Sequence, residues 1–159
     1  MNNTRFPSEM WNFVTNNRLC TLATQSEKGL THLSYLYYMI DGEKLYFVTD
    51  PSSKKAKNIS LSGEVVILIA TEVEPQSLEC SANAKIVEDT TLKINIFDKL
   101  SKVSNANESS LNWPPLFQLK PEHLIVIEID ITSFSYLNFG GLKSIYRGVP
   151  FDWTAQSFK

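Results

Sequence analysis

The stretch LYFVTDPSSKKAKN, residues 45–58, guides the interpretation of the rest of the chain. It begins with the alternation of a β-strand and continues through a serine turn into a short helix, which we predict over residues 54–62. Ser53 stands at the expected N-cap, Gly63 stands where glycine commonly ends a helix, and residues 51–63 contain no acid. A strand, a turn and a helix N-terminus in this order present free backbone N–H groups to an anion.

The first turn of this helix carries an unusual charge. Lys54, Lys55 and Lys57 are three of the 15 basic residues of the chain. Lysines here are unfavourable toward the positive end of the helix dipole, and a bound phosphate would resolve that conflict. The alternative is that Ser53 is only a cap and that the lysines form a solvated face. The residues by themselves leave both interpretations open.

The segments before this stretch predict strands in hairpin order. Strands are expected at residues 18–24, 30–40 and 43–50, and Asp41-Gly42 is a strong signal for a tight hairpin between the last two. We therefore predict that these three strands form an antiparallel meander. Its last strand leads directly into the serine turn.

The segments after the stretch complete the predicted sheet. Residues 65–70 form a continuous apolar run, as expected of a strand that is buried on both faces. Residues 76–88 and 123–139 predict two further strands, with a helix capped by Asp89 and a loop over residues 104–122 between them. Six strands with two or three short helices predict a mainly β fold, a small antiparallel barrel with helical covers.

Composition limits the class of protein. The chain has 159 residues, of which 43% are hydrophobic and 20% charged, and this predicts one domain with a packed core. We expect residues 1–139 to form the domain and residues 140–159 to be a tail that packs on it or on a dimer partner. The formal charge of −2 argues against a nucleic-acid binder. No signal peptide or membrane span is evident, so the sequence predicts a cytoplasmic protein.

Protein-borne catalysis is hard to assemble from this sequence. Cys20 and Cys80 show no metal-ligand spacing, so no metal site is expected and both thiols are predicted to be buried. His32 and His123 are the only histidines, and each is more simply a half-exposed strand residue than a base. The common nucleotide, hydrolase and metalloprotease motifs are absent. The catalytic residues are therefore unknown, and a cofactor would carry any reaction.

Five segments stand in a characteristic order along the chain: GLTHLSY (29–35), DG (41–42), LYFVT (45–49), SKKAKN (53–58) and CSANAKIVED (80–89). In this order they resemble the pyridoxamine 5′-phosphate oxidase-like family of FMN-binding split β-barrels, in its general stress protein-like branch. The resemblance runs over residues 11–139. It departs at Ala82, where glycine is common in the family.

The resemblance implies a six-stranded antiparallel split β-barrel, and a homodimer with FMN at the subunit interface. It places the FMN phosphate on Thr49, Ser53, Lys54 and Lys55, with Lys55 the foremost ligand. It places the isoalloxazine edge along Leu33, Ser34, Tyr35 and Leu36, largely through backbone groups, with Val48 beside the ring system.

The family's oxidases grip pyridoxamine phosphate through an Arg-x-His near the C-terminus, and this chain has no such pair. Its only arginines are Arg5, Arg18 and Arg147. We therefore expect an FMN-dependent oxidoreductase of unknown substrate rather than the vitamin B6 activity. The alternatives are a flavin-storing or flavin-sensing protein without turnover, and a split barrel that uses F420 or haem. A single-stranded nucleic-acid binder, which would combine aromatic platforms with lysines, is disfavoured by the net negative charge.

Overall fold

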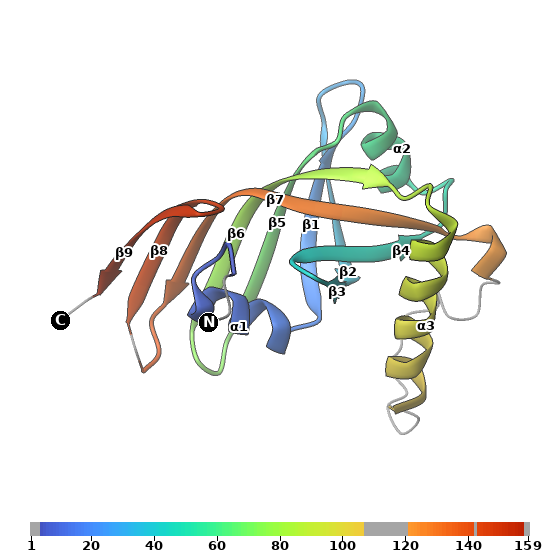
Figure 1. Cartoon of the computed structure of the whole chain (residues 1–159). Coiled ribbons are helices and arrows are strands. Elements are labelled where there is room, and N and C mark those ends of the chain that lie inside the picture. The colour runs from blue at the N-terminus through green and yellow to red at the C-terminus, as the bar shows by residue number, and fades with distance from the viewer. Residues whose placement is uncertain (1–3, 107–120, 142, 158–159) are drawn as a thin grey trace.

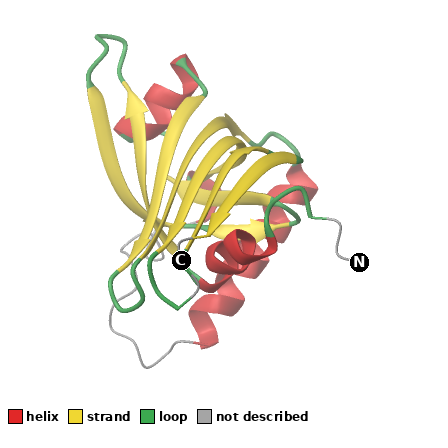
Figure 2. Ribbon diagram, turned by 90° about the vertical axis from the view of Figure 1, so that its left-hand side faces the viewer, coloured by secondary structure: helices red, strands yellow, loops and turns green. Residues whose placement is uncertain are grey.

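The computed structural model describes residues 4–106, 121–141 and 143–157 (Figure 1). Its helices are α1 (Ser8–Asn16), α2 (Lys54–Leu61) and α3 (Thr90–Ala106), with a short 3-10 turn at Pro121–His123. The strands are β1 (Leu19–Gln25), β2 (Thr31–Tyr37), β3 (Met39–Asp41), β4 (Lys44–Thr49), β5 (Glu64–Thr71), β6 (Gln76–Ile86), β7 (Ile125–Asn138), β8 (Ser144–Val149) and β9 (Asp152–Ser157). They form one strongly curved antiparallel sheet (Figure 2).

The sheet is a barrel that does not close. Its strand order is β2-β1-β5-β6-β7-β4-β3, with β8 and β9 added beside β7. Only Tyr38 separates β2 from β3 in the chain, yet the two strands lie at opposite ends of this order. The Tyr38 N–H donates instead to the carbonyl oxygen of Arg18 at 2.9 Å. The predicted antiparallel split barrel with helices is confirmed.

The described residues form nine strands where the sequence predicts six. The predicted strand 30–40 is divided at Tyr38 into β2 and β3, and the predicted tail supplies β8 and β9. Because of the division, β2 pairs with β1 while β3 pairs with β4, so the three-strand meander becomes two separate hairpins. The predicted Asp41-Gly42 turn is confirmed, and Gly42 has a positive φ of 60°.

The apolar strand β5 is buried on one face only, so that prediction is wrong for the other face. Val65, Ile67 and Ile69 are buried in the barrel. Val66 and Leu68 alternate with them and remain 41% and 43% exposed. An uninterrupted apolar run therefore covers the outside of the barrel here as well as filling its inside.

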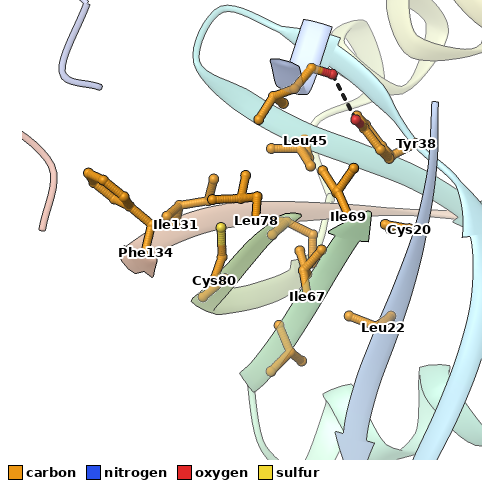
Figure 3. Packing of buried hydrophobic residues seen from close by; sticks show 14 of the residues in the cluster. Cys20, Leu22, Tyr38, Leu45, Ile67, Ile69, Leu78, Cys80, Ile131 and Phe134 are labelled. Atoms are coloured by element: carbon orange, nitrogen blue, oxygen red, sulfur yellow. Dashed lines mark hydrogen bonds between the residues drawn. The ribbon is translucent and has the colours of Figure 1, made fainter. Parts of the chain in front are cut away.

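The core fills the barrel and is closed by helices. Residues from β1, β4, β5, β6 and β7 meet in its centre, and the Tyr38 hydroxyl donates to the carbonyl oxygen of Val14 in α1 at 2.7 Å (Figure 3). A second cluster lies under α3 and contains Tyr46, Val48, Val87, Ile96 and Val126. Helices α1 and α2 lie at opposite ends of the barrel (Figure 1). Within the described residues, none of the helices combines the length and apolarity needed to cross a membrane.

The C-terminal segment extends the sheet on the side away from α3 (Figure 1). Strand β8 pairs with the last residues of β7, and β9 pairs with β8. Side chains also anchor it, because Ser144 and Asn138 each donate to the Glu9 carboxylate of α1 at 2.8 Å. Contact of this segment with a dimer partner stays a prediction.

Candidate functional site

The turn between β4 and α2 is rigidly built from its own side chains. The Asp50 carboxylate accepts hydrogen bonds from the backbone N–H of Ser52 at 2.6 Å and from its hydroxyl at 2.5 Å. Ser53 caps α2 by accepting from the N–H of Ala56 at 3.3 Å, as predicted. Its hydroxyl also lies 3.1 Å from that of Thr49, which is buried at the end of β4. The two hydroxyls of the predicted phosphate site are therefore in contact.

The three lysines of this segment differ in their surroundings. Lys54 and Lys57 are exposed, whereas Lys55 is half-buried. Burial lowers the pKa of the Lys55 ammonium below its ordinary value. Lys55 makes no hydrogen bond or ion pair with any described residue, and the first turn of α2 contains no acid. Lys55 is thus a cation held partly out of water with no anion supplied by the described part of the chain.

Buried polar contacts fix α2 against the barrel. The side-chain amide of Asn58 donates to the Thr24 hydroxyl of β1 at 3.0 Å, and both side chains are buried. The helix also lies against β2 and β6. Thr24 is not among the residues predicted for the site. Its position does give a signal, since Thr24 shares its strand face with the buried Cys20 and Leu22.

Gly63 does not end α2 in the left-handed conformation that the sequence suggests, because the helix is closed by an extended Ser62. A glycine is needed because Gly63 lies against β6. A Cβ atom at this position would stand 2.7 Å from the carbonyl oxygen of Ala84. The Gly63 carbonyl oxygen accepts from the Ala84 N–H at 2.7 Å, which fixes the end of the helix to the sheet.

The predicted β2 residues divide between the two faces of that strand. Ser34 and Leu36 face inward, and Leu36 is buried. Leu33 and Tyr35 face outward and are 64% and 72% exposed. Among the described strands β2 pairs only with β1, so its other edge presents unpaired backbone groups. This edge could bind a planar ligand through its backbone, as the resemblance implies.

The structure does not bring the Val48 side chain to this site. Thr49 and Val48 point to opposite faces of β4, and Val48 packs against Val87, Val126 and Ile96 under α3. The outcome follows from the alternation of a strand, which places adjacent side chains on opposite faces. Contact of Val48 with a bound ring system stays a prediction.

An apolar surface, formed by Leu33, Tyr35, Val66 and Leu68, covers the outer face of β2, β1 and β5. The register places Leu33 opposite Ala23 and Ala23 opposite Val66, so the first row of this surface crosses three strands. Tyr35, Thr21 and Leu68 form the next row in the same way. We call it the outer apolar surface.

A hollow opens at each end of the outer apolar surface. The larger has a volume of about 600 Å³ and is lined by apolar residues together with polar ones that include Gln25, Thr31 and Asn83. The smaller, of about 400 Å³, is lined in part by Arg18, Tyr35 and Tyr37.

Comparison with known proteins gives a consistent result. The model of the pyridoxamine 5′-phosphate oxidase family matches residues 6–136. No curated protein sequence matches. Similar solved structures include a pyridoxamine 5′-phosphate oxidase-related, FMN-binding protein from Nostoc punctiforme, with a TM-score of 0.65 and 15% identity, covering 89% of this chain and 87% of that one.

Two other similar structures differ in what their names state. One is an F420 reductase, with a TM-score of 0.64 and 22% identity, covering 82% of this chain and 98% of that one. The other is the haem storage protein HutZ from Vibrio cholerae, with a TM-score of 0.62 and 18% identity, covering 77% of this chain and 87% of that one. These likenesses show a shared fold. With the family match over residues 6–136, they establish that the chain belongs to the pyridoxamine 5′-phosphate oxidase family.

Proposed function

We propose that the protein is an FMN-binding flavoprotein and acts as an oxidoreductase on a small molecule that remains to be identified. The observation that carries this proposal is Lys55, a half-buried cation with no partner among the described residues, beside the capped N-terminus of α2. Family membership supports a phosphate-bearing cofactor at this point, and an FMN-binding protein is among the similar structures.

Each part of the site would have a separate task. Lys55 and Lys54 would neutralise the FMN phosphate. The free N–H groups of α2 would donate hydrogen bonds to it, as would the one proton that the mutual hydrogen bond of Thr49 and Ser53 leaves available. The unpaired edge of β2, from Leu33 to Leu36, would contact the isoalloxazine through its backbone. A bound flavin supplies hydride and electron transfer, and the protein supplies orientation and electrostatics.

The outer apolar surface supports a homodimer with the cofactor at the interface. Leu33, Tyr35, Val66 and Leu68 each keep at least 41% of their surface exposed in the single chain. Contiguous apolar surface of this kind commonly marks a protein interface. It lies on the strand that carries the predicted cofactor residues, so a second copy bound there would also cover the cofactor. A cytoplasmic location is expected but stays a prediction.

The arginines do not favour pyridoxamine phosphate as substrate. Arg5 is bound to Glu43 and to the Asp130 carboxylate, 2.7 Å away. Arg147 donates to the Ser135 hydroxyl at 3.2 Å. Only Arg18 remains exposed without a side-chain partner among the described residues. A second phosphate would therefore find few available arginines to bind it.

F420 and haem are the alternative cofactors, because similar folds include an F420 reductase and a haem storage protein. A second alternative is storage or sensing without turnover. The absorption spectrum of the bound molecule distinguishes the three cofactors. Anaerobic reduction by NAD(P)H, followed by reoxidation with candidate acceptors, distinguishes an oxidoreductase from a storage protein.

The decisive experiment identifies by mass the molecule that co-purifies with the protein, and then measures FMN affinity after its removal. Lys55→Ala should weaken FMN binding by at least tenfold, the loss expected for one charge-assisted contact. Lys57→Ala is the matched control, because it removes the same charge from the opposite side of the same helix. Absence of FMN binding in the wild type, or equal binding by both variants, would refute the proposal.

A further inference from the structure

His32 lies on the inward face of β2, beside the proposed site. It is half-buried, and its Nδ1 atom lies 3.4 Å from the hydroxyl of Ser34, two residues along the same face. From the sequence alone, His32 is predicted to be a half-exposed strand residue. Its Nε2 atom has no partner among the described residues.

Two contacts connect His32 to α2. His32 stands directly opposite Thr24 in the pairing of β1 and β2, so both side chains point to the same face of the sheet. The Thr24 hydroxyl accepts the hydrogen bond from Asn58 of α2. Asn58 is one turn beyond Lys55, and residues three apart lie on the same side of a helix. The His32 side chain therefore lies on the same face of the sheet as the contact with α2, and Lys55 lies on the side of α2 that carries Asn58.

We propose that His32 is a further ligand of the anion at the N-terminus of α2, and that it makes the site selective for a phosphorylated flavin. This inference rests on the proposed function. When the Ser34 hydroxyl donates to Nδ1, the proton of the neutral ring lies on Nε2 and is available to a phosphate oxygen. Ser34 is then a positioning residue, and His32 makes the contact.

The test compares the affinities for FMN and for riboflavin, which is the same flavin without the phosphate. His32→Thr preserves the strand preference of the position but is too short to reach the anion. It should weaken FMN binding by about tenfold, the value of a hydrogen bond to a charged group, and leave riboflavin binding unchanged. His32→Arg should restore FMN binding, because a longer cation can make the same contact.

A composition-matched control exchanges two adjacent residues. His32→Thr combined with Thr31→His moves the imidazole to the outward face of β2. This double variant should bind FMN as weakly as His32→Thr. Thermal unfolding without ligand checks that all the variants fold.

The possible outcomes are distinct. If the wild type binds FMN and His32→Thr retains the same preference for FMN over riboflavin, the role of His32 is refuted while the proposed function stands. An equal loss of FMN and riboflavin binding would also refute it, because that result indicates a structural effect. If the wild type binds neither flavin, the proposed function and this inference fail together.

Discussion

Replacing Lys55 by methionine should separate its cost to folding from its value in binding. Methionine keeps the apolar stem and removes the charge. Burial holds the pKa of Lys55 below its unfolded value, so at neutral pH the charged form opposes folding. The ligand-free variant should therefore unfold at a temperature no lower than that of the wild type. The difference in ligand-free unfolding temperature between the variant and the wild type should shrink as the pH rises through the lowered pKa of Lys55, because the wild-type lysine then becomes neutral.

With FMN bound, the order of stability should reverse, because Lys55→Met binds the ligand more weakly than the wild type. At an FMN concentration of 100 times Kd, binding stabilises the wild type by about 2.7 kcal/mol. Loss of a charge-assisted contact of about 2 kcal/mol weakens Kd by about 30-fold and leaves about 0.9 kcal/mol at the same concentration. For a domain of this size, FMN should therefore raise the Tm of Lys55→Met by about 4–7 °C less than it raises the Tm of the wild type.

Differential scanning calorimetry with and without FMN measures both effects on the same samples. Lys57→Met, on the exposed side of α2, should leave both Tm values unchanged. The reasoning would be refuted if Lys55→Met lowered the ligand-free Tm by several degrees while its FMN-induced shift matched that of the wild type. Lys55 would then be a structural residue.

Three other changes test the fold around the site. Leu68→Lys places a charge in the outer apolar surface and should convert a dimer into a folded monomer, as measured by light scattering with circular dichroism. Glu128→Gln should lower the free energy of unfolding by about 2 kcal/mol at neutral pH, as measured with urea. It removes a carboxylate that accepts from two lysines and Tyr46. Burial alone would raise the pKa of Glu128, but these bonds outweigh it and lower the pKa, so its contribution should disappear as the pH falls through that lowered pKa. Gly63→Ala should lower the free energy of unfolding by about 1–3 kcal/mol, because the new Cβ meets a backbone carbonyl. Gly141→Ala is the control and should lower it much less, because the space around Gly141 is open.

Local sequence patterns predict most of the helices, strands and turns, because a turn or a helix cap is determined by residues that are adjacent in the chain. The Asp41-Gly42 turn joins β3 to β4, and Asp89 caps α3 by accepting from the N–H of Leu92 at 2.7 Å. The cap at Ser53 follows from the same reasoning. Each depends on a hydrogen bond or a backbone preference that adjacent residues set. The predicted phosphate-site residues, Thr49 to Lys55, are close in space because they are close in the chain.

Features that depend on distant contacts could not be predicted in this way. The break at Tyr38 is held by hydrogen bonds to Val14 and Arg18, which lie outside the predicted strand, 24 and 20 residues earlier in the chain. The need for glycine at position 63 arises from Ala84, and the position of α2 depends on Thr24. Nothing within the predicted strand or helix carries information on these partners. Tertiary contacts therefore determine where the predicted strand 30–40 is divided and where α2 lies against the barrel.

Strand β2 carries residues of both features that the described residues leave without a partner, the proposed cofactor site and the outer apolar surface. Its inward face carries His32 and Ser34, and its outward face carries Leu33 and Tyr35. The side chains of the two faces alternate along one backbone, so a ligand at the unpaired edge and a second copy on the outer face would both contact the same strand. Under the proposed function, a ligand that orders this edge also orders the surface for the second copy. Coupling between two binding events is reciprocal, so dimer formation should tighten flavin binding by the same factor by which flavin tightens the dimer.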